Sequence, residues 1–178
     1  MSGASGTPLR VVEISRGIAG GYCGWLLQQM GASVARIGDL PAEAANPISL
    51  ALAYYAAGKQ ATPIAGAADA IARADMVITD DAAHLAALTG RSITELAAGQ
   101  PGTVFGVTSV FGLTGPLAGV AAVAIDAQAE AGVAWALGEQ ARPPLAIPPG
   151  ILECQAGAHL AAACLMARLA GPDRKSVV

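Results

Sequence analysis

Short apolar runs alternate along the chain with longer amphipathic or alanine-rich stretches. This pattern is typical of strands that alternate with helices. The stretches expected to be strands are 9–14, 33–37, 75–79 and 103–110. The stretches expected to be helices are 20–30, 48–57, 67–73, 81–89, 93–98, 120–137 and 151–169. Such alternation predicts an α/β fold, with a Rossmann-like parallel sheet flanked by helices.

The first strand, helix and strand form a βαβ unit, so the two strands are expected to be parallel with a right-handed crossover. The glycines of this unit are Gly17, Gly20, Gly21 and Gly24. A dinucleotide fingerprint needs Gly-x-Gly-x-x-Gly directly after the strand. Gly21 and Gly24 match its second half, but Ala19 stands where the first half needs glycine. The glycines are therefore better explained by close packing of the helix on the sheet than by an NAD site.

Composition limits the classes of protein that fit. Hydrophobic residues make up 54% and charged residues only 13%, whereas about 25% is usual for charged residues, so the chain hides much of its surface in a core or against a partner. The net charge of −3, with scattered Lys and Arg, argues against a nucleic-acid binder. A length of 178 residues fits one domain. We expect that domain over 9–171, with a flexible N-terminal segment 1–8 and a tail 172–178.

Cysteine usage and hydropathy indicate the compartment. Cys23, Cys154 and Cys164 show no paired spacing, which favours free thiols in a reducing compartment and no metal site. The N-terminus lacks the basic start and apolar core of a signal peptide. The longest apolar stretch, 156–170, is interrupted by His159 and Arg168 and falls short of the roughly 20 residues that cross a bilayer. We expect a soluble, cytoplasmic protein without membrane contact.

Three segments, in this order, carry a family resemblance. They are "LRVVEISRGIAGGYCGWLLQQMGASVARI" at 9–37, "TVFGVTSVFGLTGPLAG" at 103–119 and "PPLAIPPGILECQAGAHLAAACLMARLAG" at 143–171. Their order resembles that of the family III CoA-transferases, which include formyl-CoA transferase, carnitine CoA-transferase and the 2-methylacyl-CoA racemases. The resemblance runs over nearly the whole chain. It implies a Rossmann-like CoA-binding lobe, equivalent to the N-terminal lobe of longer family members.

The resemblance also implies a mechanism. The carboxylate of Glu153 would be acylated by an acyl-CoA thioester and then converted to an enzyme–CoA thioester, from which CoA passes to an acceptor carboxylic acid. A carboxylate suits this role because its mixed anhydride is readily attacked by a thiolate or another carboxylate. The residues that the resemblance places against coenzyme A are Arg16, Gly17, Ile18, Arg36, Asp39 and Lys59. The glycines of the opening unit would let the chain pass close to CoA.

The chain departs from the family pattern in several places. The nucleophile of the transferases is Asp, whereas Glu153 is one methylene longer. The proton-transferring His of the racemases is replaced by Ile125, beside Asp126, so racemisation by that pair is not expected. A basic loop of the family has become Thr79-Asp80-Asp81-Ala82-Ala83, which adds acids where CoA would approach.

Structural explanations stand beside these roles. An acid in the first turn of a helix, such as Glu153, is favoured by the helix dipole alone. His159 lies about 120° around the helix axis from Glu153, so the two are not expected to pair. Cys154 has no histidine base placed beside it and is not expected to be a nucleophile. Asp126 and Glu130 lie on one face of a helix, and solvent exposure of that face is enough to explain both acids.

Two functions remain open. One is a CoA-transferase-like enzyme that acts on acyl-CoA and small carboxylates, completed by a homodimer or by a fuller-length partner chain. The other is a non-catalytic lobe that acts as a partner or regulatory subunit of a complete enzyme.

Overall fold

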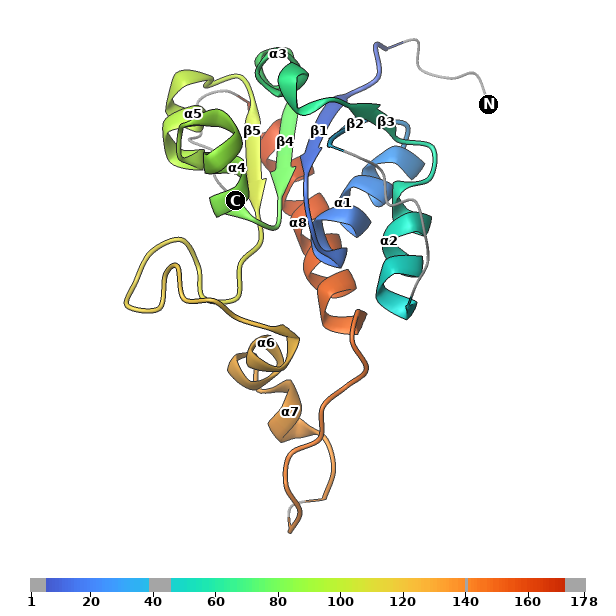
Figure 1. The fold of residues 1–178 in the computed structure, drawn as a ribbon, viewed down its shortest axis with the longest axis vertical. Coiled ribbons are helices and arrows are strands. Elements are labelled where there is room, and N and C mark those ends of the chain that lie inside the picture. The colour runs from blue at the N-terminus through green and yellow to red at the C-terminus, as the bar shows by residue number, and fades with distance from the viewer. Residues whose placement is uncertain (1–5, 39–45, 140, 172–178) are drawn as a thin grey trace.

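The protein, as a computed structural model, is described over residues 6–38, 46–139 and 141–171. Within these residues a five-stranded sheet has the order β3-β2-β1-β4-β5 (Figure 1). Its strands are β1 Arg10–Ile14, β2 Ser33–Ile37, β3 Gln60–Thr62, β4 Met76–Thr79 and β5 Val104–Val107. All neighbouring strands are parallel, so the expected α/β class is confirmed. The strand order reverses between β1 and β4, which is the switch point where Rossmann-type sheets bind ligands.

Helices cover both faces of the sheet (Figure 1). The helices around the sheet are α1 Ile18–Gln29, α2 Pro47–Ala56, α3 Ala67–Ala72, α4 Ala82–Thr89, α5 Ile93–Gly99 and α8 Ile151–Leu169, with a 3-10 turn at Ile64–Gly66 before α3. Helices α6 Ala124–Glu130 and α7 Val133–Ala136 lie away from the sheet (Figure 1). One face packs against α1 and α8, where Val11 joins a core cluster with Leu27 and Leu160. On the other face, Val12 joins a cluster with Phe105. Burial on both faces explains why most residues of the central strands β1 and β4 are apolar.

Helices α1 and α8 cross in close contact at Gly157. A Cβ at this position would lie 3.1 Å from the backbone nitrogen of Cys23 and would overlap the carbonyl oxygen of Ala19. Further along α8, Leu160 and Cys164 pack on β5, where they occupy the space that a Cβ on Gly106 would need. These two contacts fix the first turn of α8 relative to the turn between β1 and α1.

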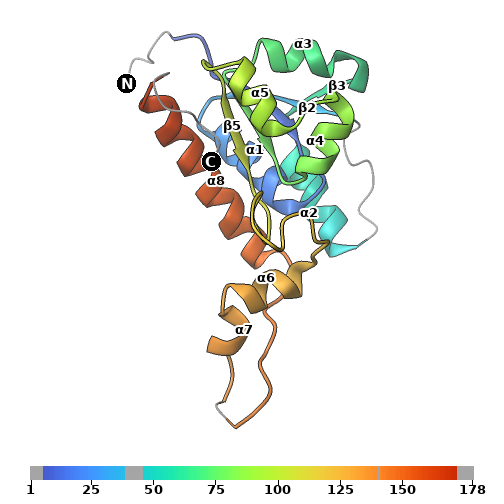
Figure 2. The ribbon, with the colours of Figure 1, turned by 90° about the vertical axis from the view of Figure 1, so that its left-hand side faces the viewer.

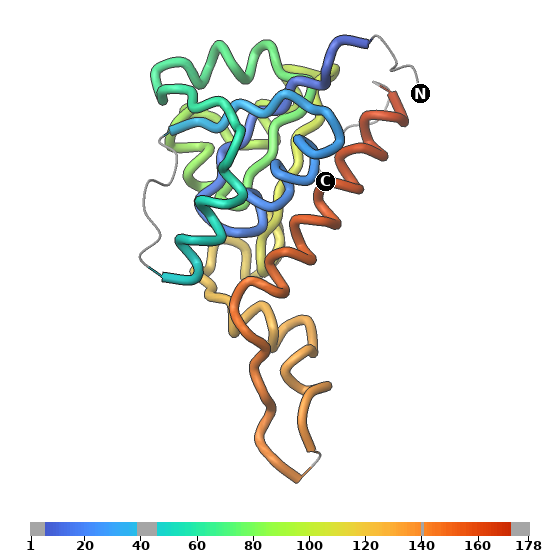
Figure 3. Tube along the Cα trace, turned by 90° about the vertical axis from the view of Figure 1, so that its right-hand side faces the viewer, coloured from blue at the N-terminus to red at the C-terminus, as the bar shows by residue number. Residues whose placement is uncertain are grey.

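Residues 111–150, which we call the arm, leave the sheet after β5 and return at the start of α8. The described part of the arm contains α6 and α7 and extends away from the sheet beyond the carboxyl ends of the strands (Figures 2 and 3). Gln128, which is 3% exposed, joins its two branches: its amide donates to the Ile147 carbonyl oxygen at 3.2 Å and accepts from the Ile147 N–H at 2.9 Å. In contrast, Trp135 is 83% exposed.

Three elements differ from the sequence-based expectation. The strand expected over 103–110 is shorter, since β5 spans only Val104–Val107. The helix expected over 120–137 is divided into α6 and α7, because Gly132 between them adopts a left-handed backbone with φ of +71°. Strand β3 was not expected, since its three residues offer no apolar run. None of the helices in the described part of the chain is long and apolar enough to cross a membrane. The domain limits at 9 and 171 stay predictions, and residues 1–5 and 172–178 lie outside the described residues.

Candidate functional site

A cavity of about 700 Å³ opens at the carboxyl edge of the sheet, at the switch point between β1 and β4. Its walls are the turn after β1, the loop after β4, the segment after β5, helix α6 and the first turn of α8. Parallel α/β sheets commonly bind ligands at this location. The polar lining residues are Arg16, Asp80, Asp81, Thr108, Ser109, Glu130 and Glu153, and the larger apolar ones are Ile18, Val110, Val123 and Leu152.

Glu153 contributes its carboxylate from the first turn of α8. The N–H of Gly150 donates a hydrogen bond of 2.9 Å to Oε2 of Glu153, which fixes the half-buried side chain at the cavity wall. Gly150 itself has a φ of +95°, a conformation that glycine adopts without strain. The partial positive charge at the helix N-terminus stabilises a carboxylate in this position.

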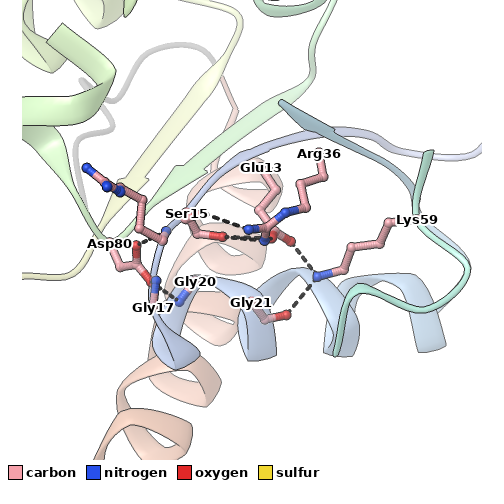
Figure 4. Close-up of polar contacts among 9 residues, drawn as sticks. Glu13, Ser15, Gly17, Gly20, Gly21, Arg36, Lys59 and Asp80 are labelled. Carbon is pink, nitrogen blue, oxygen red and sulfur yellow. Dashed lines mark hydrogen bonds and ion pairs between the residues drawn. The ribbon is translucent and has the colours of Figure 1, made fainter. Parts of the chain in front are cut away.

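Asp80 holds the turn between β1 and α1 (Figure 4). Its Oδ1 accepts from the N–H of Arg16 at 2.9 Å, and its Oδ2 accepts from Gly17 at 3.0 Å and Gly20 at 2.9 Å. A Cβ on Gly17 or Gly20 would come within 3.0 Å of this oxygen. The glycines expected to admit CoA therefore make room for a side chain of the protein itself.

Arg16 is the only cation among the residues that line the cavity within the described chain. Its side chain is 68% exposed, and Nη1 lies 3.9 Å from Oδ2 of Asp81. Asp81 also caps α4 by accepting from the N–H of His84 at 2.8 Å. The guanidinium is thus held loosely at the cavity rim, where it is available to an anionic ligand.

Arg36 and Lys59 form an internal ion cluster with Glu13 (Figure 4), and neither of the two cations lines the cavity. Arg36 Nη1 donates to Oε1 of Glu13 at 2.6 Å, and Lys59 Nζ donates to Oε2 of Glu13. The Glu13 and Lys59 side chains are fully buried, and Gly24 leaves the space that the Glu13 carboxylate needs. Burial lowers the pKa of Lys59 below its ordinary value of 10.5, an effect larger than the opposing one of the Glu13 carboxylate. Neither cation faces the cavity in this arrangement, because Glu13 binds both.

The structure thus brings Arg16, Gly17, Ile18 and Glu153 together at one cavity, and Asp39 lies outside the described residues. Asp126 caps α6, accepting from the Val123 N–H at 2.8 Å, and does not line the cavity.

Other polar residues near α8 have local partners. Exposed His159 contacts the Gln155 carbonyl oxygen at 2.8 Å through Nδ1. The Cys154 sulfur lies 3.5 Å from the Tyr55 hydroxyl, a contact that raises the pKa of Tyr55 to about 12. Burial raises the pKa of the Cys164 thiol to about 12. The described residues hold no group of three side chains able to bind a metal ion.

Sequence reasoning missed several residues of the cavity. Thr108 and Ser109 follow the carboxyl end of β5, and Val123 and Ala127 reach the cavity from the arm. The first two follow a predicted strand, and that position was a usable signal. The arm residues carry no local pattern that points to the cavity.

Comparison with known proteins shows the same fold in solved structures. Rv3272 from M. tuberculosis, in its orthorhombic form, matches with a TM-score of 0.76 and 23% identity, over 96% of this chain and 52% of that chain. A CAIB/BAIF family protein from Brucella suis matches with a TM-score of 0.75 and 23% identity, over 91% of this chain and 48% of that chain. The chain therefore spans about half the length of these structures.

The sequence itself matches the model of one protein family. Residues 59–174 match the family described as CoA-transferase family III, a range that covers more than half of the chain and includes Glu153 and the arm. No curated protein matches the sequence significantly. The chain therefore belongs to CoA-transferase family III.

Proposed function

We propose that the cavity binds an acyl-CoA thioester with its reactive carbonyl beside Glu153, and that the protein transfers CoA to a small carboxylic acid. The observation that carries the proposal is the carboxylate of Glu153, fixed by the Gly150 N–H in a cavity at the switch point of the sheet. Membership of CoA-transferase family III implies CoA-thioester substrates. Coenzyme A is therefore the expected ligand, as part of a substrate.

The chemistry divides into steps in which a bond to Glu153 forms as another breaks. The Glu153 carboxylate attacks the thioester carbonyl, and CoA leaves as a thiolate, which gives a mixed anhydride. The thiolate then attacks the glutamyl carbonyl, which releases the donor acid as a carboxylate and leaves CoA on Glu153 as a thioester. The acceptor carboxylate attacks this thioester and expels the thiolate again. The thiolate finally attacks the acyl carbonyl of the second anhydride, which yields the new acyl-CoA and frees Glu153.

Arg16 and the β1–α1 turn are proposed to position the substrates. The guanidinium of Arg16 has the geometry to pair with a carboxylate or a phosphate. Gly17 and Ile18 form the adjoining wall, against which the thioester would lie. Arg36 and Lys59 stay predictions as CoA contacts, and their burial against Glu13 does not support that role.

A second candidate function is a non-catalytic lobe that supports or regulates a complete family member. It is favoured by Glu153 in place of the Asp of the transferases. An added methylene displaces the carboxylate by about 1 Å, which can lower a rate roughly 100-fold. In either case we propose a homodimer or a complex with a fuller-length subunit, located in the cytoplasm.

Titration calorimetry tests whether the cavity binds CoA. The purified chain is titrated with CoA and with acetyl-CoA, alongside Glu153→Gln and Glu130→Gln, which alters another carboxylate of the same cavity. We expect micromolar binding by all three proteins, because the variants remove a charge and keep the volume. Absence of binding at millimolar CoA or acetyl-CoA would overturn the proposal that the chain is an enzyme by itself.

The supporting-subunit function predicts a different result. A lobe of this kind would bind no CoA by itself, yet it would raise the activity or stability of a fuller-length family III enzyme when the two are mixed.

A further inference from the structure

We propose that Asp80 is a specificity-determining residue. Its carboxylate occupies the anion site of the β1–α1 turn, so that the turn excludes phosphate groups and the diphosphate of CoA binds elsewhere. The part that concerns CoA rests on the proposed function. The occupation of the turn by Asp80 does not.

Three backbone N–H groups converge on this carboxylate. Those of Arg16, Gly17 and Gly20 donate to Asp80 over 2.9–3.0 Å at the N-terminus of the twelve-residue helix α1. In Rossmann-type folds such N–H groups, together with the helix dipole, hold the diphosphate of a nucleotide. The turn therefore has the donors of a phosphate site.

The donors already have an acceptor within the chain. Asp80 follows β4 and reaches the turn across the switch point, 60 to 64 residues away in sequence. A phosphate oxygen bound to the N–H groups of Gly17 and Gly20 would overlap Oδ2 of Asp80, and the two negative charges would repel each other. Occupation by Asp80 and by a phosphate are thus mutually exclusive.

The position of Asp80 also affects what the cavity can bind. Asp80, Gly17 and Ile18 line the same cavity as Glu153. With the turn closed to phosphate, the wall beside it is left for the uncharged thioester end of an acyl-CoA. The charged end would then lie toward the cavity rim, where the exposed guanidinium of Arg16 is located.

Removing the carboxylate should create a phosphate site. Asp80→Ala, Asp81→Ala and the unaltered chain are titrated with inorganic diphosphate and followed by phosphorus NMR. Asp81→Ala is the matched control, because it removes an adjacent carboxylate of the same cavity without freeing the N–H groups of the turn. We expect Asp80→Ala to bind diphosphate about tenfold more tightly than the other two proteins. Equal binding by all three would overturn the proposal.

Two further measurements decide the matter if Asp80→Ala does not fold. Asp80→Asn keeps the shape and one acceptor oxygen but removes the charge, and we expect it to bind diphosphate more tightly than the unaltered chain. In the unaltered, nitrogen-15-labelled chain, diphosphate should leave the amide signals of Gly17 and Gly20 unmoved. Diphosphate binding by Asp80→Asn no tighter than by the unaltered chain, or displacement of these two signals, would contradict the proposal.

The proposed function can fail separately. If the unaltered chain binds no CoA while Asp80→Ala gains a diphosphate site, the transferase function of the chain by itself is wrong and the occupation of the turn by Asp80 stands.

Discussion

Two carboxylates in different environments lie close to the first strand. Glu13 and Asp80 are both carboxylates near β1, yet Glu13 is fully buried against two cations, whereas Asp80 accepts from backbone N–H groups at the edge of the cavity. Both are accommodated by glycines of α1 and its preceding turn. Gly17, Gly20 and Gly24 are therefore explained by internal carboxylates, and Glu153 is the carboxylate that we propose for the chemistry.

Replacement of Glu13 tests the internal ion cluster. Glu13→Ala leaves Lys59 and Arg36 buried without their counter-ion, and we expect the free energy of unfolding to fall by about 3–5 kcal/mol. Urea denaturation followed by circular dichroism measures this. Glu139→Ala, which breaks an exposed ion pair with Arg142, should change little.

A second variant separates loss of the ion pair from loss of packing. The double variant Glu13→Gln with Lys59→Met removes the charges of the Glu13–Lys59 pair and leaves Arg36 as the one buried cation of the cluster. It should recover part of the loss, since fewer buried groups are left unpaired. A double variant less stable than Glu13→Ala would count against the cluster as described.

Asp75 gives the fold a dependence on pH. It accepts from the backbone N–H and the guanidinium of Arg10, and Arg168 of α8 lies 3.5 Å away. The Arg10 hydrogen bond holds the pKa of Asp75 below its ordinary value of 3.8. A carboxyl group whose pKa is lower in the folded state contributes stability above its unfolded pKa, and this is lost as the pH falls through the folded value.

We therefore expect Asp75→Asn to be less stable than the unaltered chain at neutral pH. The difference should begin to shrink near pH 3.8, where the unfolded chain starts to bind a proton, and should vanish only below the lowered pKa of the folded state, where Asp75 is protonated too. Urea denaturation at a series of pH values measures it, and Arg10→Met should weaken the same dependence. A difference that stays constant down to low pH would show that Asp75 acts through something other than its charge.

At the scale of elements, some features could be predicted from the sequence and others could not. The bounds of α8 follow from a long apolar run that begins after Gly150, and the residues over 151–169 match the prediction. The break at Gly132 was missed because an alanine-rich stretch has high helix propensity on both sides of it. Contacts such as Asp80 with Gly20 join residues 60 positions apart, and such a separation leaves no local pattern.

The crossing of α1 and α8 depends on one glycine. Gly157→Ala places a Cβ against the backbone of Ala19 and Cys23, which cannot move aside as a side chain can. We expect a loss of about 1–3 kcal/mol of unfolding free energy from overpacking, measured by urea denaturation. Gly102→Ala is the matched control, since nothing lies within 4 Å of its added Cβ. Equal effects of both variants would contradict the close crossing.

At the scale of the whole molecule, the arm exposes many large apolar side chains. The large apolar side chains exposed on it are Leu113, Leu117, Val120, Val123, Ile125, Trp135, Leu137 and Leu145. Exposed apolar surface on this scale is typical of an interface with another chain. The arm is therefore involved in both the proposed association and the proposed function, because α6 also lines the cavity.

Association through the arm has a direct test. Analytical ultracentrifugation of the unaltered chain should show a species larger than the monomer. Trp135→Asp, which places a charge on the most exposed aromatic of the arm, should shift the population to monomer. Met166→Asp is the control, as Met166 is 63% exposed on α8, away from the arm. If the unaltered chain sediments as a monomer at every protein concentration, self-association through the arm is contradicted.

The proposed function requires that Glu153 form a covalent bond with the substrate, and mass spectrometry of the intact chain can detect this bond. The unaltered chain, Glu153→Gln and Glu130→Gln are incubated with acetyl-CoA and then with hydroxylamine, which converts an anhydride or thioester of a glutamate side chain to a stable hydroxamate. We expect a hydroxamate on Glu153 in the unaltered chain and in Glu130→Gln, and none at that position in Glu153→Gln. A chain that binds acetyl-CoA but carries no adduct on Glu153 would show that this carboxylate is not the nucleophile.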